Sequence, residues 1–259
     1  MKNRSSVKNI SISILLSLTL FFVCGEAFAR AGGGGGHSSG GGSHSHSSSR
    51  GRYHGPATAF ENFVGLCCMG LFGLSFSLIG LGNLNFYRLL RKKSGEAGEM
   101  LARIKNSDPS WNPDHIRDRV RKAYFSLQRA WMARNQDLAK EFMSEKLYNH
   151  HKMMTDAMIA RHEKNILDEI ELSDSQVVSV EDHTGGDRDI LWIYITGSMI
   201  DYKINDVTGY TISGDRSKKE KFNELWKFIK NDEGNWILDE IKNRVNYTDF
   251  NNFKAVSEI

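Results

Sequence analysis

Three runs near the end of the chain read ILWIYITGSMIDYKI at residues 190–204, KFNELWKFIK at 221–230 and NWILDEIK at 235–242. They are rich in β-branched and aromatic residues, and turns rich in Gly, Asp and Asn separate them, which is typical of strands. In the first run, alternate residues form two faces, and both faces are largely apolar near its start. We therefore predict a sheet that is covered on both sides, with its cover supplied by residues upstream.

One long amphipathic helix is predicted ahead of this sheet. Its apolar positions recur at steps of four, four, three and four residues, and they are Ile116, Val120, Tyr124, Leu127 and Trp131. Asn112 is a predicted cap, and Pro113 stands where a helix start tolerates proline. A second helical region is predicted over residues 137–164, and the first strand is predicted from Val177.

The remaining parts of this region are predicted to be irregular. Residues 205–219 are polar and rich in Gly, which indicates a long exposed hairpin loop. Residues 87–111 are predicted to form a basic connector with a turn at Asp108-Pro109 and a brief amphipathic helix. After Tyr247 the sequence is polar, and we expect a loose tail over residues 251–259.

Four blocks of sequence, in this order and spacing, resemble the Tim-forty-four-like domain family. They read DRVRKAYFSLQRAW, RHEKNILDEIELSD, ITGSMIDYKINDVTGYTISGD and FNELWKFIKNDEGNWILDEI, and the resemblance covers roughly residues 98–250. The family is named for the subunit that tethers the mitochondrial protein-import motor, and it also occurs in single-span bacterial membrane proteins.

The resemblance implies an α+β fold with a nuclear-transport-factor-two-like cone, in which helices pack on a curved antiparallel sheet around a cavity. We expect this domain over residues 112–250. The cavity would serve binding rather than catalysis, and a role in the assembly or translocation of membrane or exported proteins would follow. The long charged N-terminal region of the mitochondrial relatives is lacking here, so motor tethering is not implied.

The N-terminus reads as an export signal. Residues 1–29 combine a basic start, an apolar centre and an A-x-A ending, which predicts a secretory signal peptide; an uncleaved signal anchor is the alternative. Residues 30–60 are rich in Gly, Ser and His and predict a disordered linker. The linker histidines lack Cys or carboxylate neighbours, so we predict no metal site.

Residues 63–86 carry no charge and are long enough to cross a bilayer as a helix, which predicts a single transmembrane span. A buried core helix is the alternative, but the many glycines favour a membrane helix. The basic cluster that follows predicts that the C-terminal domain is cytoplasmic. The A-x-A signal is more like a bacterial export signal than an Arg-rich transit peptide, which indicates a bacterial inner membrane. Small residues at Gly73 and Ser77 leave an oligomer joined through this span open.

The net charge of +3 is unevenly distributed, because residues 88–134 carry 12 Lys/Arg against 5 Asp/Glu, whereas residues 135–259 carry 16 against 24. This polarity argues against a nucleic-acid-binding protein, whose basic surface would be expected to dominate the domain. The basic side instead indicates contact with anionic lipid. Part of it is the face of the predicted long helix opposite the apolar stripe, which carries Arg117, Arg121, Lys122 and Arg129. The predicted lipid-docking residues are Arg88, Arg91, Lys92, Lys93, Arg117, Arg121 and Lys122.

Aromatic residues are the predicted ligand-binding groups, because they supply large contact area with little entropy to lose. The predicted cavity residues are Trp131, Tyr194, Tyr202 and Trp226. The sequence leads to a membrane-anchored scaffold that binds a hydrophobic or peptide-like ligand, without cofactor, metal or catalytic residue. A cavity enzyme, an isomerase or hydrolase with Asp201 or Glu224 as a general base, is the alternative.

Overall fold

A five-stranded sheet forms the centre of the domain, in the order β4-β3-β2-β1-β5. Strands β1 to β4 pair with one another in antiparallel orientation, whereas β5 runs parallel to β1. The computed structural model describes residues 84–185 and 189–258. The strands are β1 Glu163–Asp182, β2 Ile190–Asn205, β3 Thr211–Lys230, β4 Trp236–Lys242 and β5 Ala255–Ser257. The helical elements are residues 84–104, η1 Pro109–Trp111, α3 Pro113–Ala133, η2 Gln136–Phe142, α4 Glu145–Ala160 and η3 Tyr247–Asn252.

Three predictions from the N-terminal part lie outside the described residues: the signal peptide, the linker and residues 63–83 of the predicted span. Residues 84–86 lie in the first helix. Across the described ranges, we find no helix with both the length and the apolar character needed to cross a membrane.

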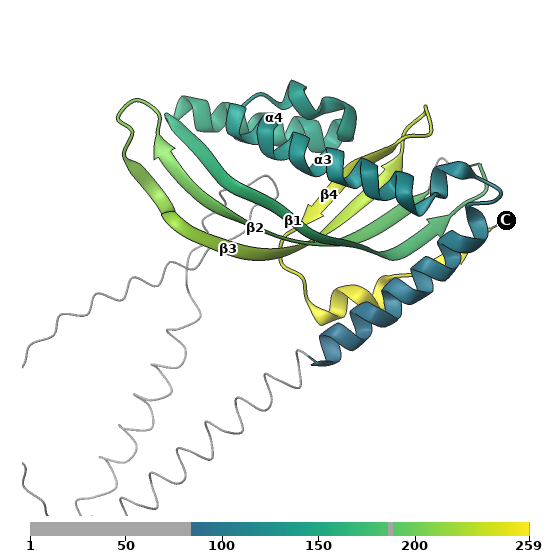
Figure 1. Ribbon diagram of the computed structural model, residues 1–259. Helices are drawn as coiled ribbons and strands as arrows, with labels where there is room; N and C mark the ends of the chain where they lie inside the picture. The colour runs from purple at the N-terminus through teal and green to yellow at the C-terminus, as the bar shows by residue number, and fades with distance from the viewer. Residues whose placement is uncertain (1–83, 186–188, 259) are drawn as a thin grey trace, which may run out of the picture.

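The sheet is curved, and it is covered on both faces. Figure 1 shows α3 and α4 on its concave side, and helix 84–104 and η3 on its convex side. Leu191, Ile193 and Ile195 of β2 are buried in the core under α3, whereas Trp192 and Tyr194 belong to a second cluster with Phe250 of η3. The predicted α+β fold, with helices on a curved antiparallel sheet, is therefore confirmed, as are the two apolar faces of β2.

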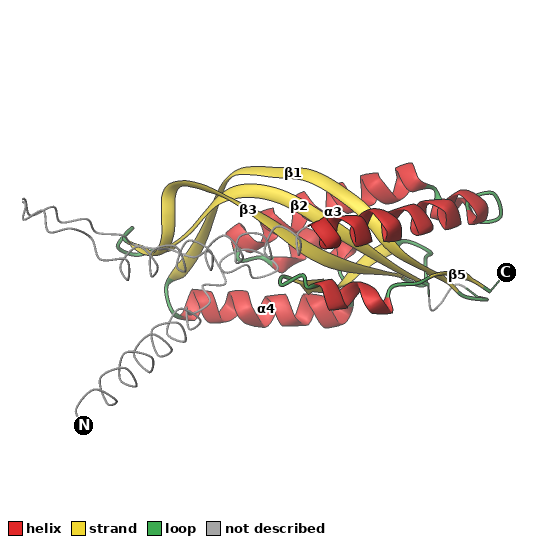
Figure 2. Cartoon of the chain, turned by 90° about the horizontal axis from the view of Figure 1, so that it is seen from below, coloured by secondary structure: helices red, strands yellow, loops and turns green. Residues whose placement is uncertain are grey.

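Irregularities in β1 accompany the curvature that Figure 2 shows along β1 to β3. The register between β1 and β2 shifts at three places, and β-bulges of this kind bend a strand and increase its twist. At the first shift, the backbone of Glu171 comes so close to Gly197 that a Cβ there would lie 2.4 Å from the Glu171 carbonyl oxygen. Gly197 is thus required by the close approach of two strands.

The helix α3 begins and packs as its sequence predicts. The Asn112 side chain accepts a hydrogen bond from the Asp114 N–H, and Pro113 occupies the first helical position. Its apolar positions Ile116, Val120, Tyr124, Leu127 and Trp131 are each no more than 2% exposed. The stripe is therefore the face that α3 buries against the sheet.

The second helical region differs from the prediction. It is divided at Met143 and Ser144, because the Ser144 hydroxyl caps α4 by accepting from the Leu147 N–H and Met143 pairs with Leu238 of β4. The helix α4 ends at Ala160, and β1 begins at Glu163, well before the predicted Val177. The apolar spacing alone did not reveal this division.

The predicted connector, hairpin loop and tail were wrong in part. Residues 84–104 form one continuous helix, and β3 begins at Thr211 because backbone pairing with β2 continues there without burial of side chains. In the predicted tail and directly before it, Phe250 is completely buried, Phe253 is 8% exposed and β5 pairs with β1. Two buried rings and this strand pairing thus order a segment whose overall composition is polar.

A buried lysine joins the turn before α3 to the ends of β2 and β3. The Lys230 Nζ lies 2.7 Å from the Asp189 carboxylate and 2.8 Å from the Asp108 carboxylate, and the rings of Trp111 and Trp236 flank it. Burial acts to lower the pKa of Lys230, but the hydrogen bonds that its ammonium group donates to the two carboxylates outweigh this effect and raise the pKa. This contact fixes the orientation of α3 on the sheet.

Candidate functional site

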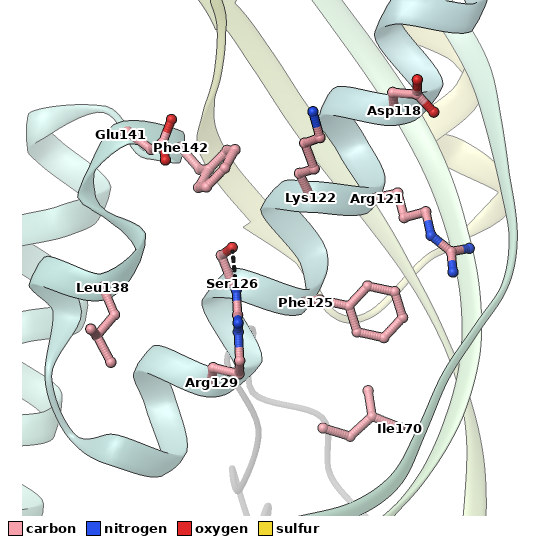
Figure 3. A pocket seen from close by; sticks show the side chains of 10 residues that line it. All are labelled: Asp118, Arg121, Lys122, Phe125, Ser126, Arg129, Leu138, Glu141, Phe142 and Ile170. Atoms are coloured by element: carbon pink, nitrogen blue, oxygen red, sulfur yellow. Dashed lines mark hydrogen bonds between the residues drawn. The ribbon is translucent and has the colours of Figure 1, made fainter.

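A pocket of about 710 Å³ opens on the outer side of α3, between this helix, η2 and β1. Figure 3 shows its lining side chains on both sides of α3, with Phe142 approaching from η2 and Ile170 from β1. The lining residues are Asp118, Arg121, Lys122, Phe125, Ser126, Arg129, Leu138, Glu141, Phe142 and Ile170.

The apolar part of this pocket comes from all three elements. Phe125 of α3 is half-buried, Phe142 of η2 is 6% exposed and Ile170 of β1 is half-buried. Leu138 is 55% exposed at the opposite side of the opening. These four apolar side chains share the lining of the pocket with six polar or charged residues.

The basic part of the pocket comes from α3 alone. Arg121 places its guanidinium carbon 5.4 Å from the Phe125 ring centre, and Arg129 donates to the Ser126 hydroxyl at 3.2 Å. Within the part of the chain that the structure describes, Arg121, Lys122 and Arg129 make no ion pair with a carboxylate. Their charge is therefore available to an anion from outside.

One of the two acidic residues at the pocket is already neutralised. Arg119 forms an ion pair with Glu141 at 3.4 Å, donates to the Glu141 carbonyl oxygen at 2.7 Å and to the Trp236 carbonyl oxygen at 2.9 Å. Its guanidinium carbon also lies 4.3 Å from the Phe142 ring centre. Arg119 thus holds η2 against α3 and leaves the pocket with net positive charge.

A smaller pocket of about 210 Å³ lies where helix 84–104, the start of α3 and the edge of β1 meet. Ser94 and Gly98 line it from the first helix, Arg117 from α3 and Gln176 from β1. Arg117 also pairs with Asp114 at 2.9 Å, so its charge is partly compensated.

Six of the seven predicted lipid-docking residues fall into two groups, and the seventh, Arg117, lines the smaller pocket. Arg121 and Lys122 line the large pocket, whereas Arg88, Arg91, Lys92 and Lys93 lie on helix 84–104. The Glu96 carboxylate lies 3.8 Å from the Lys92 Nζ and 3.4 Å from the Lys93 Nζ. Lys93 also donates to the Phe253 carbonyl oxygen at 2.7 Å, so its amino group is engaged in holding the C-terminal segment.

The four predicted cavity aromatics do not converge on one cavity. Trp131 and Trp226 are packed in the core between the sheet and α3. Tyr194 lies in the cluster on the opposite face of the sheet, and the Tyr202 ring is covered by the Arg216 guanidinium at 5.2 Å. The side-chain alternation of β2 was predicted correctly, but residues on opposite faces were assigned to one site.

The two candidate general bases are engaged in the fold. Glu224 is completely buried and accepts a hydrogen bond from the Trp226 indole N–H at 2.8 Å. Asp201 accepts from the Asn165 amide at 3.2 Å. Neither carboxylate lines either of the two pockets described above.

Sequence reasoning identified Arg117, Arg121, Lys122 and Arg129 as one basic helix face but did not find the apolar partners of these residues. Arg121, Phe125 and Arg129 follow each other at steps of four, so their side chains share one side of the helix. The spacing of these three residues could therefore have indicated a mixed basic and aromatic site on α3. Leu138 and Phe142 could not be assigned to the same site, because the prediction placed them in one long second helix.

Residues 97–243 match the family described as the Tim44-like domain, which is the family that the four sequence blocks resemble. Among solved structures, the chain is similar to the intermembrane space region of the chloroplast protein ARC6. The identity is 10%, the similarity covers 49% of this chain and 95% of that chain, and the TM-score is 0.35. A search among curated proteins gave no match.

Proposed function

The chain belongs to the Tim44-like domain family, and from this premise we propose that it is a membrane-associated binding scaffold. Its domain would bind a ligand that combines an apolar part with a negative charge, either a hydrophobic molecule or a peptide-like segment of a membrane or exported protein. The pocket between α3 and η2 would be the binding site. Anionic lipid would be contacted through the basic residues of α3 and of helix 84–104.

The observation that carries this proposal is the composition of the large pocket. Arg121, Lys122 and Arg129 have no carboxylate partner among the described residues, and they line the same pocket as Phe125 and Phe142. An apolar wall and a positive rim together favour an amphipathic anion, because each part of such a ligand finds a matching environment. Basic residues that only face solvent would not require apolar side chains such as Phe125 and Phe142 beside them.

The attachment to a membrane rests on the sequence of residues 63–86. Their length and lack of charge support a single span, and the basic residues after it support a cytoplasmic position for the domain. The export signal at residues 1–29 supports a bacterial inner membrane. In this arrangement residues 84–86, the last three of the predicted span, are also the first three of helix 84–104, so the domain stays close to the lipid surface.

The cavity enzyme is not proposed as a second function. A general base must reach the proton that it removes from a bound substrate. Glu224 is completely buried in the core, and Asp201 does not line either of the two pockets. Neither carboxylate therefore faces a described pocket in which a substrate could bind.

Photo-crosslinking of the full-length protein in its native membrane tests the proposal. A photoreactive phenylalanine analogue at Phe125 should give a discrete adduct, whose mass tells whether the ligand is a protein or a lipid. The double variant Arg121→Glu/Lys122→Glu should lose most of the adduct, because the site would repel an anion. Absence of a discrete adduct from Phe125 would refute binding in this pocket.

A matched control separates the pocket from the overall charge of the domain. Lys146→Glu/Lys152→Glu makes the same change of charge on α4, where both side chains are exposed. We expect this variant to keep the adduct. If both double variants lose it equally, the basic side acts only through its long-range field, and a specific site at Arg121 and Lys122 is wrong.

A further inference from the structure

The tip of the β2–β3 hairpin, residues 205–212, exposes large apolar side chains. Tyr210 is 78% exposed and Val207 is 71% exposed, the two highest values for large apolar side chains in the described chain, and Ile212 is 48% exposed. In Figure 1 the hairpin projects from the end of the sheet opposite to the C-terminus. No part of the described chain covers these three side chains.

Hydrogen bonds hold the tip in one shape. The Asn205 side chain accepts from the Val207 N–H at 3.1 Å and the Thr208 N–H at 2.9 Å, and the Asn205 N–H donates to the Tyr210 carbonyl oxygen at 2.9 Å. Asp206 forms an ion pair with Arg134 at the end of α3, at 2.6 Å. The apolar side chains are therefore presented by a rigid turn that is braced against the domain.

Basic residues follow the apolar tip along β3. Residues 211–221 contain Arg216, Lys218, Lys219 and Lys221 against Asp215 and Glu220, a net charge of +2. Most of these side chains are exposed, because this half of β3 lies beyond the end of β4. An apolar end with cations behind it is the arrangement that suits the boundary between lipid headgroups and acyl chains.

The second hairpin of the sheet shows that a turn here does not need apolar residues. The β3–β4 turn, residues 231–235, consists of Asn, Asp, Glu, Gly and Asn, all of them polar or small. It is closed by equivalent contacts, since Asn231 accepts from the N–H groups of Glu233 and Asn235. The apolar residues of the β2–β3 tip therefore serve something other than chain reversal.

We propose that the β2–β3 tip inserts into the headgroup region of an anionic membrane, as a second contact besides the predicted span. This inference rests on the proposed function in one respect, namely that residues 63–86 hold the domain beside a bilayer. A lipid surface fits better than a protein partner, because three side chains on a projecting turn offer no pocket of the kind in which protein interfaces concentrate their binding energy. Tyrosine is also enriched at membrane interfaces, and lysine and arginine are attracted to anionic lipid.

The experiment uses the absence of cysteine from residues 69–259. In full-length protein with Cys24, Cys67 and Cys68 changed to serine, a single cysteine replaces Val207, or Asp232 in the β3–β4 turn as the matched control. Each is labelled with an environment-sensitive fluorophore and placed in nanodiscs of phosphatidylcholine and phosphatidylglycerol, with and without doxyl-labelled lipid. Both substituted side chains are exposed, so the fold should not change.

The label at Val207→Cys should lose about half of its emission to the doxyl lipid, whereas the label at Asp232→Cys should lose little. Omission of phosphatidylglycerol should reduce the quenching at position 207, because the attraction between the basic residues behind the tip and anionic lipid is then lost. Equal and weak quenching at the two positions would overturn the proposal. So would a label at position 207 that is shielded from water but not quenched by lipid, since a protein would then cover the tip.

Alkaline carbonate extraction of the same variants from vesicles keeps the two proposals apart. Retention in the vesicles reports the predicted span and does not depend on the tip. If the chain is retained but position 207 is not quenched, the span stands and the tip contact is wrong. If the chain is extracted and position 207 was quenched, the span is wrong and the tip contact stands.

Discussion

The two faces of the sheet are closed in different ways. The concave face is covered by α3, η2 and α4, which follow each other between residues 113 and 160. The convex face is covered by residues from the two ends of the domain, with Leu90 of helix 84–104 packed beside Phe250 and Phe253. The concave side is thus one continuous core, whereas the convex side depends on two segments that are distant in sequence.

This difference separates stability from attachment. Most of the buried apolar residues lie on the concave side, so the free energy of folding should depend mainly on that core. The convex cluster holds the first half of helix 84–104 against the sheet, whereas Ala97, Leu101 and Ile104 of the same helix belong to the main core. Loss of the convex cluster should release the first half of this helix while the rest of the domain stays folded.

Truncation of the central concave residue should have the largest effect. Trp226 is completely buried and packs against Tyr124 and Phe228, so Trp226→Ala should lower the free energy of unfolding by about 4 kcal/mol. The variant also removes the indole donor of the buried Glu224. Urea unfolding gives the value, with Trp192→Ala on the convex face as control. A larger loss for Trp192→Ala would contradict the assignment of the main core to the concave face.

Truncation on the convex face should have a smaller and more local effect. Phe250 contacts the rings of Phe86, Tyr194 and Phe253, and Phe250→Ala should cost about 3 kcal/mol. Hydrogen exchange should show faster opening of helix 84–104 and β5, with α3 little changed. If the amides of α3 exchange faster by the same factor, the two faces unfold together and the comparison fails.

The same division explains what could be predicted from the sequence. The apolar stripe of α3 and the alternation in β2 were readable, because each belongs to a long element with a regular period. Phe250 and Phe253 lie in a short polar segment without a period, and no local pattern shows that they fill a gap left by a helix about 150 residues earlier. Packing between distant segments decided that part of the fold.

The candidate site was predictable to the same extent. The cations Arg121, Lys122 and Arg129 were found because they lie on one helix face. Phe142 and Leu138 were missed because the break of the second helical region depends on a cap at Ser144 and on the pairing of Met143 with β4. Tyr194 was assigned to a cavity because the sequence does not show that the convex face is filled by the C-terminal segment.

Acid should weaken the concave side. His151 is 4% exposed, and burial, assisted by the neighbouring His150, lowers its pKa to about 4. An unfolded histidine binds a proton below about pH 6.5, so the unfolded state takes up more protons than the folded state between these values. Stability should therefore fall by about 2 kcal/mol from pH 7 to pH 5.

Two variants test the origin of this acid sensitivity. His151→Leu should remove that part of the pH dependence, because the buried ring is then no longer a proton acceptor in the unfolded state. His150→Gln should keep most of it, since His150 is exposed. A pH dependence that stays the same in His151→Leu would mean that other groups cause it.

Alkali should weaken the convex side, by the smallest of these amounts. Tyr194 is 4% exposed, and burial raises its pKa to about 12 although a hydrogen bond with Asn223 acts against this. The neutral phenol of Tyr194 contributes stability that is present below the unfolded pKa of about 10 and is lost as the pH rises toward 12. The free energy of unfolding should therefore fall by about 1 kcal/mol between pH 9 and pH 11. Tyr194→Phe should abolish this loss, and Tyr210→Phe, at the exposed tip, should not.

Because Tyr194 touches Phe86 and Phe250, the loss should appear first as faster hydrogen exchange in helix 84–104. If Tyr194→Phe and the unchanged chain lose stability equally up to pH 11, the convex cluster does not depend on the neutral phenol.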